Sequence, residues 1–251
     1  MTEEAKCTIG VNILKNGLAL GEIHEPSLPT VTGDESDTFA QNNIGGVETK
    51  CIGVMRNGNL GFKLYFTGSA KDAALIDAIY DRDVSVWTVA MPSDFNGGKD
   101  GFNWSGQIAK CGPPVTDGVS PAYLDMEVTV NSKIAHTTVA ATGLTTPWFV
   151  VKDTETIPNT LTPSPVASGD DYAHTVEAYS DTASVTVTPT AGAGTIYVNG
   201  TLVASAATSA ALPLNAGVGA VTMASIVVTE LNKTPRVYWI KFVIGNTATP
   251  E

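Results

Sequence analysis

The sequence of 251 residues predicts a mainly β protein with one flanking α-helix, divided into two domains. Three observations lead to this prediction. Apolar residues alternate with polar ones in several segments, as they do in half-buried strands. Asn-Gly pairs, which tolerate the positive φ of tight hairpin turns, separate such segments. The number of charged side chains falls from 30 in residues 1–156 to nine in residues 157–251.

The change in composition coincides with a proline-rich segment. Pro158, Pro163 and Pro165 lie within eight residues, and prolines at this density favour an extended, semi-rigid chain. We therefore expect a first domain over residues 1–156, a linker over 157–165 and a second domain over 166–251.

Turns and alternation predict the strands of the first domain. Asn-Gly turns predict two β-hairpins, one joining 7–14 to 18–22 and one joining 48–55 to 60–67. Further strands are predicted at 84–90, 102–110 and 124–130. The clearest alternating apolar faces are formed by Leu60, Phe62, Leu64 and Phe66, and by Leu124, Met126, Val128 and Val130.

Only residues 69–80 show the spacing of a helix. Ser69 can cap its first turn, Asp72 follows three residues later, and Leu75, Ile76 and Ile79 form an apolar stripe. The stripe predicts that this helix covers a sheet or a partner.

Residues 23–47 form a long segment without clear periodicity, which predicts a loop. It contains the acidic residues Asp34, Glu35 and Asp37. A calcium loop of the EF-hand kind that began at Asp34 would need Gly at position 39 and Glu at position 45, where the sequence has Phe39 and Gly45. Loops of this length in compact domains are usually functional or ordered by a partner, so we expect interface contacts here rather than metal binding.

The sequence of the second domain predicts short strands separated by turns. Seven are expected, at 175–179, 183–188, 195–198, 201–204, 210–214, 221–229 and 237–244. This number and spacing of strands, without a helix, predict an Ig-like β-sandwich.

Charge and cysteine content limit the function. The formal net charge of −11 disfavours binding to nucleic acid. No segment has the ~18 consecutive apolar residues of a membrane-spanning helix, and the acidic start does not resemble a cleaved leader. Cys7, Cys51 and Cys111 show no CxxC spacing, so we expect reduced thiols in a cytoplasmic protein rather than disulfides or a zinc site.

No catalytic constellation is apparent. His24, His136 and His174 each lack a second ligand or catalytic partner at a suitable spacing, and no phosphate-binding or nucleophile-elbow motif occurs. We expect no enzyme, no cofactor and no metal site. The four tryptophans could line a sugar site, but core packing is the simpler interpretation. Asp125 and Glu127 alternate with apolar residues and predict a polar strand face that is either solvated or lines a shared, wet space.

The order of these features resembles the major tail tube protein of siphophages, the phages with long non-contractile tails. The resemblance runs from Leu20 to Ile134 and covers about half of the chain. It begins with Leu20-Gly21-Glu22-Ile23-His24-Glu25-Pro26, an acidic stretch over 30–39 and the long loop, followed by the hairpin and the helix before Val84-Ser85-Val86-Trp87. It continues with Phe102-Asn103-Trp104-Ser105-Gly106-Gln107-Ile108, Gly112-Pro113-Pro114 and the strand from Leu124 to Val130.

The resemblance implies a tail tube β-sandwich or barrel with one flanking helix, six copies of which close a ring around a continuous barrel. Stacked rings would form a virion tail tube for DNA ejection into the host, assembled in the host cytoplasm with tape measure, tail-tip and terminator proteins. The loop residues Asp34, Glu35, Asp37 and Phe39 would contact the neighbouring ring. Asp125 and Glu127 are candidates for the lumen, where negative walls repel DNA.

The second domain is similar to the Ig-like or cadherin-like modules fused to such proteins, which decorate the outside of the tube. The similarity lies in residues 195–201 and 211–217. Weak binding of this domain to host-surface glycans, with avidity from many copies, is a hypothesis that follows from the fold.

Other interpretations stay open. A tail terminator, a distal tail protein or the tube of a secretion system would share these patterns. A two-domain glycan-binding adhesin is a candidate from another class, and exposed aromatic clusters and a monomeric state would favour it.

Overall fold

The structure is a computed structural model that describes residues 11–21, 23–38, 49–66, 68, 70–91, 99–112, 122–155, 158–165, 167 and 173–248. It is mainly β, as the sequence predicts, with one helix in the described part. The chain forms two compact units. Unit 1 comprises Met1–Gly21, Trp87–Asn103 and Ala135–Glu251, and unit 2 comprises Glu22–Val86 and Trp104–Ile134.

Unit 2 is built on a four-stranded antiparallel sheet in the order β3-β6-β10-β9. Its strands are β3 (Ile23–Ser27), β6 (Leu60–Tyr65), β10 (Tyr123–Val128) and β9 (Ile108–Cys111). The predicted alternation of β6 and β10 is confirmed: their apolar residues Leu60, Phe62, Leu64, Leu124, Met126 and Val128 are all buried. Strand alternation therefore gives this sheet one apolar and one polar face.

The predicted helix is confirmed as α1 (Ala70–Tyr80), which packs against β9. Leu75 and Ala78 are buried, whereas Ile76 and Ile79 are only half-buried. Leu75 is thus buried as predicted, but the buried face of the helix continues through Ala78 and not through Ile76 and Ile79.

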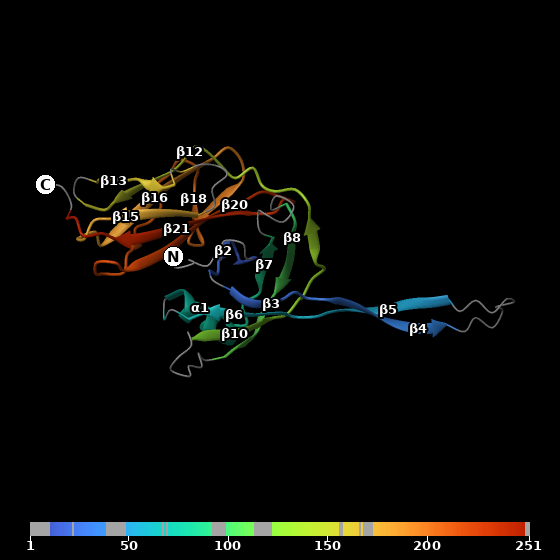
Figure 1. The fold of residues 1–251 in the computed structure, drawn as a ribbon. Coiled ribbons are helices and arrows are strands. Elements are labelled where there is room, and N and C mark those ends of the chain that lie inside the picture. Colours follow the sequence, from blue (N-terminus) through green and yellow to red (C-terminus); the bar gives the residue numbers. More distant parts are fainter. Residues whose placement is uncertain are drawn as a thin grey trace, which may run out of the picture. The chain divides into compact units, whose positions relative to one another are not determined.

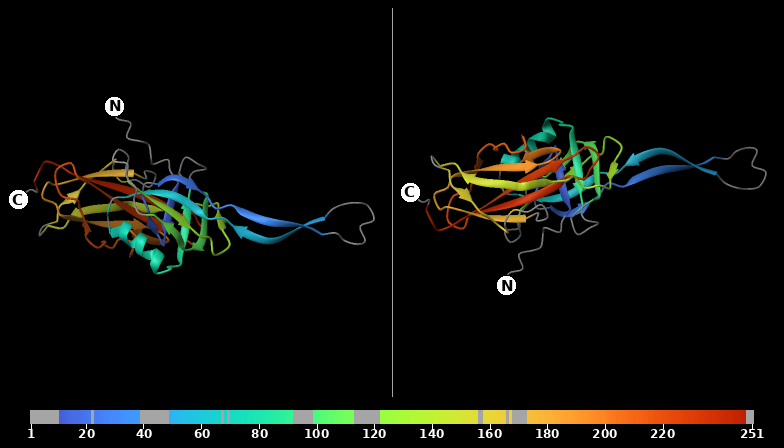
Figure 2. Two further views of the ribbon diagram at one scale, coloured as in Figure 1. Left: turned by 90° about the horizontal axis from the view of Figure 1, so that it is seen from below. Right: turned by 90° about the horizontal axis from the view of Figure 1, so that it is seen from above.

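A long two-stranded ribbon corrects two predictions. β4 (Val31–Thr38) pairs with β5 (Thr49–Asn57), while β3 pairs with β6, so the chain runs out and back as one extended hairpin (Figures 1 and 2). The predicted loop over 23–47 therefore contains two strands. The predicted hairpin between 48–55 and 60–67 is wrong, because β5 and β6 follow one another in the same direction. Gly58 instead donates its N–H to the carbonyl oxygen of Thr30, 2.7 Å away on the other arm of the same hairpin.

Unit 1 contains most of a second sheet, in the order β11-β8-β7-β1-β2. Its strands are β11 (Ala135–Thr137), β8 (Gly101–Gly106), β7 (Ser85–Ala90), β1 (Asn12–Lys15) and β2 (Leu18–Ala19). The first predicted hairpin is confirmed: β1 pairs with β2 through a turn in which Asn16 and Gly17 have φ of 50° and 82°. The division between the units falls within β7 and β8.

The predicted strand over 102–110 is two strands, β8 and β9, which belong to different sheets. Gly106 ends β8, and a Cβ there would lie 2.1 Å from the carbonyl oxygen of Thr129. The close backbone approach at this glycine ends one strand before the next begins.

The rest of unit 1 is a β-sandwich formed by β12–β21, the C-terminal sandwich. One sheet has the order β13-β12-β16-β19, with strands β12 (Leu144–Asp153), β13 (Thr160–Leu161), β16 (Ser184–Ala191) and β19 (Leu212–Pro213). The other has the order β14-β15-β21-β20-β17-β18, with strands β14 (Pro163–Ser164), β15 (Ala173–Ala178), β21 (Arg236–Ile244), β20 (Val221–Thr229), β17 (Thr195–Val198) and β18 (Thr201–Val203). All seven predicted strands are present.

The sandwich begins earlier than the sequence predicts. β12 pairs with β16 and contributes Leu144, Phe149 and Val151 to the sandwich core, so this strand lies before the predicted linker. β13 and β14 lie within the predicted linker itself. Pro147 and the register shift between Leu144 and Phe149 interrupt the alternation that would have identified β12.

Candidate assembly surface

The polar face of the sheet β3-β6-β10-β9 brings together the charged residues of four strands. The antiparallel register places Lys63 on β6 between His24 on β3 and Asp125 on β10. In the next row, Glu127 on β10 lies opposite Lys110 on β9. Residues directly opposite one another in antiparallel strands share a face, so charges of both signs meet across this sheet.

Two lysines of this face form ion pairs with carboxylates. Lys110 Nζ lies 2.5 Å from Asp125 Oδ2, and Lys63 Nζ lies 2.6 Å from Glu25 Oε2. The hydrogen bond and the charge of Glu25 raise the pKa of Lys63, and those of Asp125 raise the pKa of Lys110. The same contacts with Lys63 lower the pKa of Glu25. These side chains are about half exposed or more, so each pair contributes little to stability but fixes where the cations point.

The two sequence-predicted residues of β10 line one shallow hollow. Asn59 Nδ2 donates to Glu127 Oε1 at 2.5 Å. Gly61 on β6 lies between Ser27 on β3 and Glu127 on β10, and its missing side chain leaves space there. The hollow has a volume of about 320 Å³ and is lined by Ser27, Asn59, Gly61, Lys110, Asp125, Met126 and Glu127. Asp125 is exposed and Glu127 half-buried, so both face an open, wet surface. That this surface lines a lumen stays a prediction.

The sheet ends in two edge strands, β3 and β9, beyond which no further strand pairs in the described part of the chain. β9 carries exposed Ala109 and Lys110 and has a register shift against β10. β3 is irregular: its register shifts between His24 and Ser27, around Glu25 with φ of 50° and Pro26. Bulges, prolines and lysines at edges limit unwanted pairing, so only a partner strand that fits these irregularities would pair with β3 or β9.

The predicted inter-ring residues lie on the ribbon. In its backbone register Glu35 is opposite Ile52 and Asp37 is opposite Lys50, while Asp34 lies at a register shift. Phe39 lies outside the described residues. The contact predicted for these residues stays a prediction, but the segment that carries Asp34, Glu35 and Asp37 is a strand and not a loop.

Sequence reasoning missed the lysines as members of this surface. Lys63 alternates with Phe62 and Leu64, and Lys110 lies within a segment predicted as strand, so both positions could have been assigned to a polar face. Their pairing with Glu25 and Asp125 could not, because it depends on which strands are neighbours.

Each histidine takes part in local contacts. The His24 ring packs edge-on against Tyr123, with 4.9 Å between the ring centroids. His136 Nε2 lies 3.1 Å from Asp100 Oδ1. Buried His174 has its Nδ1 3.0 Å from the Pro165 carbonyl oxygen. Within the described ranges, no group of three or more His, Cys, Asp and Glu side chains could hold a metal ion.

The tryptophans take part in packing. Trp87 and Trp104 are buried, and Trp148 and Trp239 are partly buried against apolar clusters of unit 1. This agrees with the core interpretation of these residues. None of the helical residues that the structure describes forms a segment long and apolar enough to cross a bilayer.

Comparisons with known proteins give a distant structural likeness. No protein-family model matches the sequence. No curated protein matches it significantly either. Among solved structures, a chain of the six-fold symmetrised cryo-EM structure of the anti-feeding prophage (AFP) baseplate aligns with 10% sequence identity and a TM-score of 0.40. The alignment covers 50% of this chain and 89% of that chain. A likeness this weak assigns neither a family nor a function.

Proposed function

We propose that this protein is a structural virion subunit that builds a phage tail tube from stacked six-copy rings, through which DNA passes into the host. The observation that carries the proposal is the sheet β3-β6-β10-β9, which has one apolar face next to α1, one polar face and two edge strands without a described neighbour. A sheet of this kind can join copies of itself edge to edge.

Edge pairing between copies would close the sheet. If β9 of one copy pairs with β3 of the next, six four-stranded sheets form a barrel of 24 strands, and every edge inside the ring is removed. The apolar faces and their helices would then lie outside the barrel and the polar faces inside it. Asp125 and Glu127 would line the lumen.

The charges of the polar face suit a conduit for DNA. Retention of DNA depends on lysine and arginine side chains that contact phosphates. On this face Lys63 and Lys110 are each paired with a carboxylate. A lumen with these pairs and with Glu127 would repel phosphates within about a Debye length, about 8 Å at physiological salt.

The ribbon β4–β5 supports contacts between rings. A two-stranded ribbon is marginally stable alone in water, so a ribbon that pairs with no other described strand is expected to gain stability from a partner. In the proposed assembly that partner is a copy in the next ring, contacted through Asp34, Glu35, Asp37 and Phe39. Tape measure, tail-tip and terminator proteins would be further partners, and assembly would take place in the host cytoplasm.

Electron microscopy of one edge variant and its matched control tests the proposal. The full-length wild type, concentrated and imaged in negative stain, is expected to form rings or hollow tubes. Ala109→Pro places a proline ring on the exposed edge of β9 and should abolish them, while Ala109→Ser keeps the N–H and should leave them intact. Circular dichroism and gel filtration of all three proteins check that they remain folded. Tubes from Ala109→Pro would refute edge pairing through β9, and a wild type that stays monomeric at every soluble concentration would count against self-assembly.

A further inference from the structure

Part of the larger sheet of the C-terminal sandwich is buried on both faces, although Val221 and Met223 at the start of β20 are exposed. Ala224, Ile226 and Val228 on β20 point into the sandwich core. Val227, on the opposite face of the same strand, is nevertheless fully buried, with 0% of its surface exposed. A strand of an isolated two-sheet sandwich exposes its outer face, so another layer must cover Val227.

The covering layer comes from the start of the chain and from β7. Leu14, Ala19 and Ala90 form one buried apolar cluster with Val227 and Val237, and Tyr197 and Trp239 pack against it. The Trp239 indole N–H donates to Asn12 Oδ1 at 3.3 Å. Both layers therefore lie within unit 1 and share a core.

Two hairpin turns fix the approach of these layers. A Cβ at Gly17, in the β1–β2 turn, would lie 2.8 Å from the ring of Tyr197. A Cβ at Gly200, in the β17–β18 turn, would lie 2.9 Å from the Cβ of Leu18. Glycine is required in both turns for the positive φ, and here it also leaves room for the neighbouring layer.

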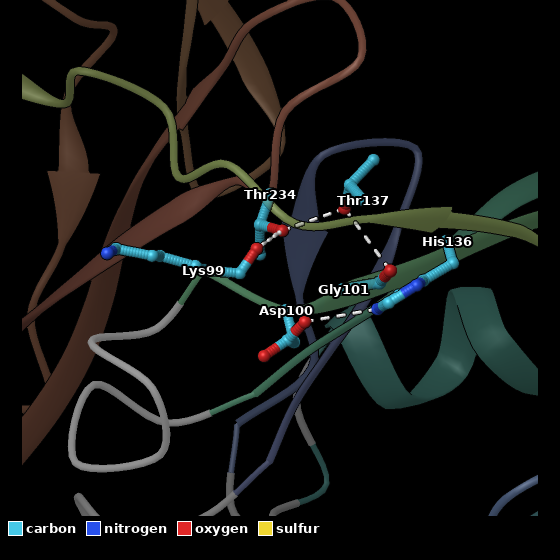
Figure 3. A network of polar contacts seen from close by, with 6 residues as sticks. All are labelled: Lys99, Asp100, Gly101, His136, Thr137 and Thr234. Carbon is cyan, nitrogen blue, oxygen red and sulfur yellow. Dashed lines mark hydrogen bonds and ion pairs between the residues drawn. The ribbon is translucent and has the colours of Figure 1, made fainter.

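A buried polar network makes a second, separate connection (Figure 3). Thr234, in the β20–β21 loop, has no exposed surface, and its hydroxyl lies 2.7 Å from that of Thr137 and donates to the carbonyl oxygen of Lys99. Because Thr234 donates its one proton to Lys99, the Thr137 hydroxyl can donate its own proton either to Thr234 Oγ1 or to the carbonyl oxygen of Gly101, 3.2 Å away. The backbone of Thr234 adds hydrogen bonds of 2.8 Å with Val139 and Ala141.

We propose that the outer face of β20 and β21 around Val227 and Val237 is an intrachain docking surface, and that the C-terminal sandwich unfolds as one cooperative unit with β1, β2 and the parts of β7 and β8 that belong to unit 1. The sandwich is then a structural requirement for the N-terminal strands and not a removable decoration. Without it, Leu14, Ala19 and Ala90 would lose the apolar partners that bury them. This inference depends on contacts within one chain and holds independently of the proposed tube.

Hydrogen exchange of the unassembled full-length protein tests the inference. Val187→Ala removes two methyl groups from the sandwich core, away from the docking surface, and Val227→Ala makes the same change within it. If the unit is cooperative, both variants increase exchange in residues 12–20 and 87–90 about tenfold, by the same factor as in β16 and β20.

The contrary result is equally clear. If Val187→Ala speeds exchange only within residues 144–248, the two layers unfold separately and the inference is wrong. Protection of residues 12–20 that survives Val227→Ala would also overturn it. Should either variant fail to fold, Thr234→Val, which keeps the side-chain volume, takes its place, and protection at residues 12–20 and 87–90 that withstands it would overturn the inference in the same way.

Discussion

Thr234→Val is expected to destabilise unit 1 through the loss of one buried hydroxyl. Valine has nearly the same shape, so packing changes little, but the Lys99 carbonyl oxygen loses its donor and the Thr137 hydroxyl loses a neighbour. The Thr137 hydroxyl can still donate to the Gly101 carbonyl oxygen. An acceptor left without its partner costs about 1–3 kcal/mol when buried, and we expect about 1–2 kcal/mol because Lys99 lies at the surface.

Calorimetry measures this loss directly. At about 2–4 °C per kcal/mol for a protein of this size, the melting temperature should fall by about 2–8 °C. Thr229→Val is the matched control: its hydroxyl makes one 3.3 Å bond to the Thr195 carbonyl at an exposed position, so its effect should stay within about 0.5 kcal/mol. Equal melting temperatures for Thr234→Val and Thr229→Val would refute the argument that the network connects the two layers.

Three further changes have expected outcomes. Gly17→Ala combines a φ of 82° with a Cβ 2.8 Å from the Tyr197 ring, so chemical denaturation should show a loss of at least about 1 kcal/mol, and an unchanged midpoint would contradict the close packing. Hydrogen bonds from Lys233 and from the Thr142 backbone lower the pKa of Glu230. Its contribution to folding stability is therefore present at neutral pH and is lost as the pH falls through that lowered pKa. The difference in stability between wild type and Glu230→Gln should therefore shrink below about pH 4, and a difference that grows with acidity would show the sign to be wrong. Asp125→Asn frees Lys110, so assembled tubes should retain DNA at low salt and release it as salt rises, whereas retention equal to that of wild-type tubes would argue against a lumenal position.

Local patterns were sufficient for much of the fold. Alternation identified β6 and β10, and helical spacing identified α1, because burial of one face imposes a period on each element. Turns between short apolar segments identified the seven strands of the second domain. The Asn16-Gly17 turn was likewise predictable, since it joins adjacent strands. The Asn57-Gly58 pair was misleading: Gly58 contacts Thr30 from the other side of a long hairpin, and the sequence near it carries no trace of that distant partner.

The candidate surface was likewise predictable from the sequence only in part. Asp125 and Glu127 could be assigned to a polar strand face by their spacing alone. The ion pair of Lys110 with Asp125 required the order of strands, which nonlocal pairing decides.

The sequence by itself determined the mainly β class, helix α1 and the alternating faces, because these depend on residues within one element. Only the tertiary structure decided that β4 and β5 form a ribbon and that the C-terminal sandwich begins at β12. It also decided that Val227 is covered by the first strands of the chain. In the segment 224–228 only Ser225 is polar, and such a segment is typical of a strand buried on both faces. The identity of the covering layer follows instead from contacts between residues more than 200 positions apart, such as Asn12 and Trp239.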